Sequence, residues 1–191
     1  MKNLALLDEM QLNLAKERVL VLDDVVDNNS MFYLEYQLNK LKKIDKDFGV
    51  KKPEPIEILI NSPGGSVLDC LGLINLMYSM KEEGYIIKTH IRGYAASCAS
   101  VIAVCGSKGY RTMGRFSKHL VHQVSGGVVG ELQLMQNELE FTEELWEDLK
   151  KIYMENSNFK NEELEEIKKY KLDLWLNSQK CLELGLADKI V

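Results

Sequence analysis

The chain has 191 residues, of which 46% are hydrophobic and 28% charged, and its formal net charge is -5. This composition predicts one compact globular domain over residues 1–191 and excludes a disordered, fibrous or coiled-coil protein. With 24 basic against 29 acidic residues, the chain has no positive field to attract nucleic acid or an anionic membrane. We therefore expect neither of these as a partner.

The four cysteines have neither CxxC spacing nor a neighbouring histidine cluster suited to zinc; they are Cys70, Cys98, Cys105 and Cys181. This pattern predicts no metal site and a reduced, cytoplasmic setting. The first 24 residues lack the pattern of a signal peptide because Asp8 and Glu9 interrupt their apolar stretch. The apolar run 95–105 is far shorter than the roughly 20 residues that span a bilayer, so it indicates buried core.

Alternating strand and helix signals occupy the first half of the chain. Residues 19–22 form a short apolar run, and 28–30 supply caps for a helix that carries Met31, Leu34, Leu38 and Leu41. Lysines, glycine and prolines predict a loop over 42–55, and 56–60 is a second strand. A turn at 61–65 then leads into a helix from Val67, which Gly84 ends.

A third strand is predicted over 86–91, followed by a turn at Gly93 and an apolar helix over 97–105. Three successive units of strand and helix are typical of an α/β domain with a largely parallel sheet.

After Gly106 the pattern changes to two short strands, over 111–113 and 120–123, and a glycine-rich joint over 126–130. A long helix is predicted over 131–155. Its mostly apolar face is broad enough either to lie in the core or to contact a partner as well; it includes Met135, Leu139, Thr142, Trp146, Leu149 and Tyr153.

Two shorter helices complete the predicted elements. Asn161 is expected to cap the first of them, with Glu162 and Glu163 in its first turn. Asn177 or Ser178 is expected to cap the last helix, which Gly185 ends.

Few residues could act as an imidazole base. His90 lies inside a predicted strand, which favours a structural or exposed role, and His119 resembles an ordinary surface histidine. His122 stands near the end of a strand, before Ser125 and two glycines, where α/β sheets place reactive side chains.

Ser97 is the natural nucleophile candidate because it stands at a turn from strand to helix among small residues. The unpaired N–H groups of a helix N-terminus could stabilise an oxyanion there. A simple capping role is the more common one for such a serine. Cys98 and Ser100 are nearby nucleophiles, but their positions along the helix point them elsewhere. The motif over 61–65 is either a tight turn or a cradle for an anion.

These motifs together resemble the ClpP family, the proteolytic subunits of ATP-dependent Clp proteases. The resemblance rests on INSPGGSV at 60–67, GYAAS at 93–97, LVHQ at 120–123 before a glycine pair, and the closing run WLNSQKCLELGLADKIV, in order and with similar spacing. It implies an α/β fold of the ClpP/crotonase type, a spiral of ββα units with a protruding long handle helix, here over residues 131–160.

The resemblance also implies a serine endopeptidase that needs no cofactor or metal. Ser97 would be the nucleophile, His122 the general base and Asp173 the acid that orients the imidazole. The backbone N–H groups of Gly65 and Cys98 would form the oxyanion hole. The implied partners are other copies of the chain in two stacked heptameric rings around a chamber, a Clp ATPase, and unfolded polypeptide substrates.

The sequence departs from the family pattern at several places. Val124 stands where the family has proline after His-Gln, and Ala99 where it has glycine. The segment 1–16 is shorter than the family's axial gate, Glu57 and Leu59 replace aromatic residues of the ATPase-docking strand, and the loop over 42–55 is longer than usual. These departures leave the catalytic groups in place but affect the surface that meets the ATPase.

Four alternatives stay open at this point. The first two are a non-catalytic ClpP-like assembly subunit and a crotonase-type acyl-CoA enzyme that uses backbone oxyanion donors. The others are a Ser-Lys peptidase and a phage-type protease that matures capsid proteins without an ATPase.

Overall fold

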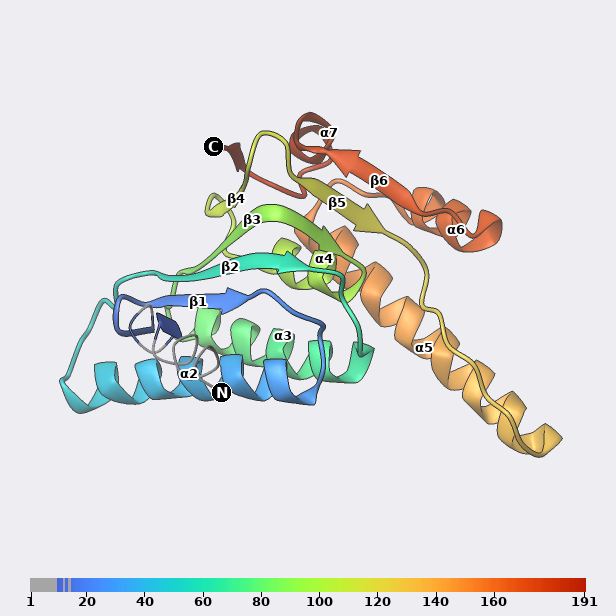
Figure 1. Cartoon of the computed structure of the whole chain (residues 1–191), viewed down its shortest axis with the longest axis horizontal. Helices are drawn as coiled ribbons and strands as arrows, with labels where there is room; N and C mark the ends of the chain where they lie inside the picture. Colours follow the sequence, from blue (N-terminus) through green and yellow to red (C-terminus); the bar gives the residue numbers. More distant parts are fainter. Residues whose placement is uncertain (1–9, 12, 14) are drawn as a thin grey trace.

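The computed structural model describes residues 10, 11, 13 and 15–191, and most of the predicted segment 1–16 lies outside this range. A seven-stranded sheet is covered by helices (Figure 1). The strands are β1 (Val19–Leu22), β2 (Ile56–Ser62), β3 (Ile87–Ala96), β4 (Arg111–Met113), β5 (Lys118–Val121), β6 (Leu174–Asn177) and β7 (Lys189–Ile190). The helices are α2 (Asn28–Asp47), α3 (Val67–Glu82), α4 (Cys98–Val104), α5 (Leu132–Asn156), α6 (Asn161–Tyr170) and α7 (Ser178–Glu183).

The sheet is parallel except at one edge, which confirms the predicted α/β class. Strands β1, β2, β3, β4 and β7 are neighbours in that order, and all of these pairs are parallel. The two halves of the long strand β3 pair with different strands: residues 89–91 pair with β4, and residues 94–96 pair with β5. Strand β6 then adds to β5 in the antiparallel sense. The end of β3 therefore leads into a corner formed with β5 and β6.

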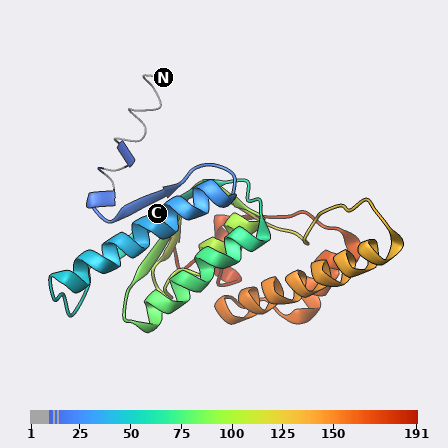
Figure 2. The ribbon, with the colours of Figure 1, turned by 90° about the horizontal axis from the view of Figure 1, so that it is seen from below.

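Helices α2 and α3 lie side by side along one face of the sheet (Figures 1 and 2). Their apolar residues meet the alternating inward residues of β2, whose burial changes with every step as the pleat requires. All seven residues of α4 are buried, so this short helix lies in the centre of the core. The core thus holds the segment that follows β3 rigidly in place.

The predicted loop over 42–55 is partly wrong, because α2 continues to Asp47. Asp45 is buried and forms a two-pronged ion pair with Arg18 at 2.8 and 2.9 Å. Leu41 lies on the same buried side of the helix. The many lysines of this stretch suggested a loop, whereas a distant arginine and core contacts stabilise a further turn of helix.

Other element bounds also moved. Strand β3 runs through the expected turn at Gly93, since its second half pairs with β5. β5 begins two residues earlier than predicted and ends at Val121, so that His122 follows the strand. Asn161 is the first residue of α6 and Lys160 is its cap, which corrects the predicted cap. Asn177 caps α7 as expected, accepting a bond from the Lys180 N–H.

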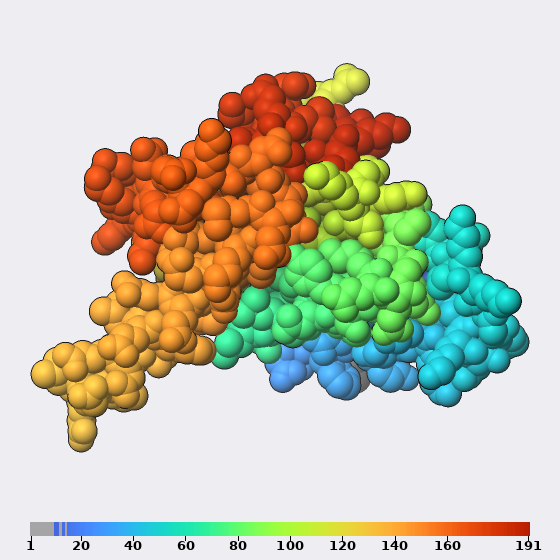
Figure 3. Space-filling model, turned by 180° about the vertical axis from the view of Figure 1, so that it is seen from behind, coloured from blue at the N-terminus to red at the C-terminus, as the bar shows by residue number. Residues whose placement is uncertain are grey.

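The long helix α5 leaves the body of the molecule at one end (Figures 1 and 3). Trp146, Leu149 and Tyr153 are buried, whereas every residue from 132 to 141 is exposed. Within the part of the chain that is described, no helix has the length and apolar character needed to cross a membrane.

Candidate active site

Ser97 lies in a strained turn between β3 and α4. Its φ of 55° and ψ of -128° put a side-chain-bearing residue in a region that glycine prefers. The backbone on both sides is held, because the Ser97 N–H donates to the Leu120 carbonyl at 3.1 Å and its own carbonyl accepts from the Ser100 N–H at 2.9 Å. Ser97 occupies the N-cap position, yet its side chain makes no capping hydrogen bond. The simple capping role considered for this serine therefore does not describe it.

A glycine loop packs directly against this turn. Gly64 has a φ of 87°, and a β-carbon there would lie 2.5 Å from the Ala96 carbonyl oxygen and 2.6 Å from the Ser97 β-carbon. Gly65 has a φ of 153°, and a β-carbon there would lie 2.2 Å from the Val26 carbonyl oxygen. Only glycine lets the backbone after β2 approach the serine this closely.

Two backbone N–H groups lack acceptors at this contact. Within the described residues, neither the Gly65 N–H nor the Cys98 N–H donates to a protein acceptor. The Cys98 N–H is the first of the helix α4, and the opening N–H groups of a helix have no partner inside it. The turn thus presents polar donors beside Ser97.

His122 and Asp173 meet because of the register between β5 and β6. Val121 pairs with Leu174 in this antiparallel ladder, so the residues just beyond that pair are neighbours. His122 Nδ1 lies 3.7 Å from Asp173 Oδ1. This separation is within reach of an ion pair but is longer than a hydrogen bond. The exposed fraction is 24% for the His122 side chain and 69% for that of Asp173.

Ser97 and His122 line one small pocket of about 40 Å³, together with Gly65 and Cys98. They stand at the same edge of the sheet, because β3 and β5 are parallel and both residues follow the carboxyl ends of these strands. That edge is where open α/β sheets place their reactive groups. The apolar walls of the pocket include residues that sequence reasoning did not assign to the site: Val67, Val101, Leu149 and Tyr153.

The pocket-lining role of Leu149 and Tyr153 was missed because their spacing shows only that they lie on the apolar face of a helix. The neighbouring nucleophile candidates are both engaged in contacts. The Ser100 hydroxyl hydrogen-bonds the buried Tyr153 hydroxyl, and the Cys98 thiol donates to the Gly65 carbonyl at 3.1 Å.

The other histidines lie away from this pocket. His90 Nδ1 contacts the Thr112 hydroxyl at 2.8 Å between β3 and β4, as expected for a structural residue. His119 is fully buried rather than at the surface, which corrects the prediction. Its strand β5 lies between β3 and β6, so both flanks are covered. Burial lowers the pKa of His119 to about 3, and neither ring nitrogen has a hydrogen-bond partner among the described residues.

Comparison with known proteins agrees with the arrangement of these elements. The sequence profile described as Clp protease matches residues 4–191. Proteins named ATP-dependent Clp protease proteolytic subunit are similar to this chain in several bacteria. The one of Porphyromonas gingivalis is 30% identical over 97% of this chain and 83% of its own length. Those of Streptococcus sanguinis and Streptococcus mutans are each 31% identical over 93% of this chain and 86% of their own length. The chain therefore belongs to the Clp protease family.

Proposed function

We propose that this protein is a serine endopeptidase that hydrolyses peptide bonds of unfolded polypeptides, with Ser97 as nucleophile. The observation that carries the proposal is the strained turn at Ser97, which lies in one pocket with His122 and beside two N–H groups without acceptors. Such a strained conformation persists only where the surrounding structure stabilises it, and strained residues cluster at active sites. Membership of the Clp protease family supports the same chemistry.

In the proposed mechanism, His122 removes the hydroxyl proton of Ser97 as the oxygen attacks the scissile carbonyl carbon. The carbonyl becomes an oxyanion, which accepts hydrogen bonds from the Gly65 and Cys98 N–H groups. His122 then gives its proton to the leaving amine, and an acyl-enzyme remains. Water, activated by the same imidazole, releases the acid and restores Ser97.

Asp173 is proposed to orient His122 and to stabilise its protonated form during the reaction. The 3.7 Å separation of Nδ1 and Oδ1 supports this role, because catalytic contacts are often long before substrate binds.

The alternative functions fit these observations less well. A non-catalytic subunit would not need a strained serine beside a histidine and a carboxylate. No lysine lines the pocket among the described residues, which disfavours a Ser-Lys pair. The Clp protease match disfavours an acyl-CoA enzyme of the crotonase type. A capsid-maturing protease shares the proposed chemistry and differs only in its substrate.

Family membership implies an oligomer that works with a Clp ATPase, and we propose that the oligomer consists of two stacked heptameric rings. The exposed apolar side chains of residues 132–141 support a contact made by the handle region 131–160. We further propose that residues 1–191 form one peptidase domain and that it acts in the cytoplasm, where its four free, buried thiols would stay reduced. The relatives' names support an ATPase partner.

Active-site labelling tests the proposed mechanism. A fluorophosphonate should label Ser97 in the oligomeric protein, and Ser97→Ala should abolish labelling and lower kcat/KM for a fluorogenic peptide by at least about 10³-fold. Ser79→Ala, at an exposed position on α3, is the matched control and should label normally. His122→Ala should lose comparable activity, whereas His90→Gln should retain it. Absence of labelling in assembled wild-type protein would contradict the proposal.

A further inference from the structure

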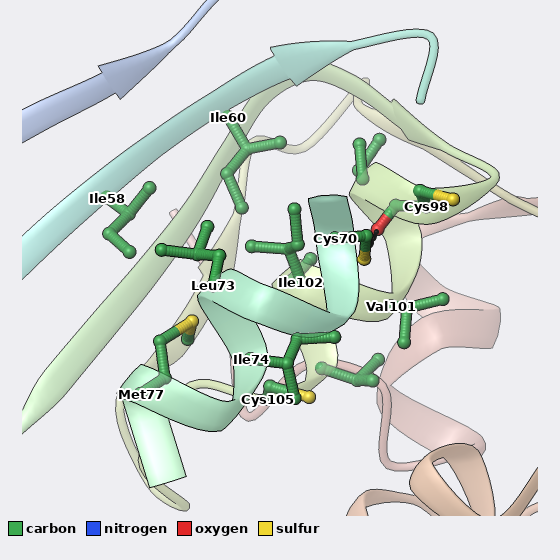
Figure 4. Close-up of a cluster of buried hydrophobic side chains, with 14 of the residues drawn as sticks. Ile58, Ile60, Cys70, Leu73, Ile74, Met77, Cys98, Val101, Ile102 and Cys105 are labelled. Atoms are coloured by element: carbon green, nitrogen blue, oxygen red, sulfur yellow. Dashed lines mark hydrogen bonds between the residues drawn. The ribbon is translucent and has the colours of Figure 1, made fainter. Parts of the chain in front are cut away.

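Two cysteine thiols lie directly behind the turn that carries Ser97. Cys70 reaches from α3 toward the start of α4, where its thiol donates to the Cys98 carbonyl at 3.4 Å (Figure 4). The Cys98 thiol in turn donates to the Gly65 carbonyl at 3.1 Å. The two thiols therefore bond to the backbone of Gly65 and Cys98, two residues that line the pocket with Ser97.

The pKa values of the two thiols are shifted in opposite directions, as expected if one thiol reacts first and the other second. The neighbouring Cys98 side chain raises the pKa of Cys70 well above its ordinary value, and burial adds to this rise. The Cys70 side chain in turn lowers the pKa of Cys98, although burial opposes the change. A thiol with a lowered pKa is the better nucleophile, and a protonated thiol beside it can act second.

Access to the two thiols also differs. Both residues are buried, with exposed fractions of 1% for Cys98 and 0% for Cys70, but only Cys98 is among the residues that line the pocket of about 40 Å³ with Ser97. A cavity of this size holds a few molecules as small as water. The pocket is therefore large enough for a molecule of the size of hydrogen peroxide beside Cys98.

Neither of the other two cysteines has a lowered pKa or a place in the pocket. Burial raises the pKa of Cys105 to about 12 and that of Cys181 to about 12, which makes each a poor nucleophile. Neither residue lines the pocket that contains Ser97.

We propose that Cys98 is an oxidation site for small hydroperoxides and that Cys70 is its resolving thiol, so that a Cys70–Cys98 disulfide reversibly switches off the active site. The effect on catalysis rests on the serine peptidase function proposed above. The disulfide itself is independent of that function.

The reaction needs only hydrogen peroxide as co-reactant. The Cys98 sulfur attacks one peroxide oxygen, the O–O bond breaks, and water leaves once the displaced hydroxide takes the thiol proton. The Cys70 sulfur then attacks the Cys98 sulfenic acid, the S–S bond forms, the S–O bond breaks, and a second water carries away the Cys70 proton. Two thiols are oxidised by two electrons in all, and one peroxide is reduced to two waters.

Loss of activity follows from the loss of two hydrogen-bond donors. A disulfide sulfur has no proton, so the bonds to the Gly65 and Cys98 carbonyls would both disappear. The new bond would also pull Cys98 toward α3. Because the N–H groups of these segments are the proposed oxyanion donors, we expect kcat/KM to fall by about 10²-fold, the size seen when one such donor is removed.

The test uses the full-length oligomer treated with hydrogen peroxide. Remaining thiols are blocked with iodoacetamide in denaturant, and a digest is searched by mass spectrometry for the linked Cys70 and Cys98 peptides. Peptidase activity is measured before oxidation, after it, and after dithiothreitol. We expect the linked peptide to appear as activity falls, and both changes to reverse with dithiothreitol, which methionine oxidation would not do.

Variants separate the roles of the cysteines. Cys105→Ala removes the other cysteine of the segment between Gly93 and Lys108, and it should still form the link. Cys181→Ser, in α7, is the matched control and should respond as wild type does. Cys70→Ser keeps a hydroxyl donor for the Cys98 carbonyl but cannot form the link. In this variant, dithiothreitol should not fully restore the peptidase activity lost to peroxide, because an unresolved sulfenic acid oxidises further. The activity is compared with that of the same variant in its reduced form.

Three results would overturn the inference. They are absence of the linked peptide from oxidised wild-type protein, a link to Cys105 in place of Cys98, and a linked protein that remains fully active. If no peptidase activity were found even in reduced protein, while the link formed, the failure would belong to the proposed function and not to the thiol pair.

Discussion

Trp146 and Tyr153, on the inner half of α5 (residues 142–156), are each 2% exposed, whereas Leu132 and Leu139, on the outer half (residues 132–141), are 73% and 61% exposed. Both halves continue one apolar face at helical spacing. The inner half packs against α4 and α6, while the outer half extends past the body of the molecule (Figure 3). The same pattern therefore lies in the core at one end and forms an exposed apolar surface at the other.

The largest loss of stability should come from truncating the inner half. Tyr153→Ala removes a buried ring that packs edge-on against Phe159 and bonds the Ser100 hydroxyl. We expect the free energy of unfolding to fall by about 3 to 5 kcal/mol, measured by urea denaturation at one fixed protein concentration. Lys151→Ala is the control on the same half, because its ion pair with Asp148 is exposed and should contribute less than about 0.5 kcal/mol. Equal effects of the two variants would contradict this view of the inner half.

A somewhat smaller loss of stability is expected from a change at the C-terminal end of the inner half of α5. Arg111 is buried, donates to the carbonyl of Asn156 at the end of α5, and pairs with Asp188 at 2.6 Å. Asp188→Asn leaves that guanidinium without its counter-charge, so we expect the free energy of unfolding to fall by about 3 kcal/mol.

The same ion pair should make stability depend on pH. Burial alone would raise the pKa of Asp188, but hydrogen bonds and charge from Arg111 outweigh it and lower the pKa below the ordinary value of 3.8. Its contribution is thus complete above pH 3.8 and is lost as the pH falls through the lower, folded-state pKa. The difference in free energy of unfolding between wild type and Asp188→Asn should accordingly become smaller in acid. A difference that stayed constant with pH would argue against the ion pair as its source.

The smallest effect is expected from the outer half, and it concerns assembly. Leu139→Ala should weaken association by about 1.5 kcal/mol for each buried leucine, close to tenfold in the dissociation constant. Light scattering over a dilution series measures this change. Thr142→Ser, a small change where the two halves meet, should assemble as wild type does. If Leu139→Ala assembled normally, the outer half would not be the contact between copies.

Much of the fold could be predicted because its signals are local. The strands over 19–22 and 111–113 and the helix from Val67 were confirmed, since short apolar runs and turn residues mark their ends. The continuation of α2 to Asp47 could not be predicted, because its buried ion pair joins residues that are 27 positions apart. Strand β6 was missed as well, since its four residues include the exposed Trp175 and its existence depends on pairing with β5.

The candidate site was likewise predictable from the sequence only in part. The motifs around Gly65, Ser97 and His122 could be recognised from the sequence alone. The contact of His122 with Asp173 required the antiparallel register of β5 and β6. The position of Cys70 behind Cys98 required the packing of α3 on α4, which no local pattern reveals.

Local sequence patterns were sufficient to predict the α/β class, most helices and strands, and the small residues that let two backbone segments meet at Ser97. Three features became visible only in the folded chain: His119 is buried, half of α5 has no partner within the described residues, and two thiols lie behind the turn at Ser97. The physical reason is that propensity and turn chemistry act between neighbours in the chain. Burial, register and charge pairing depend instead on residues that folding brings together from far apart.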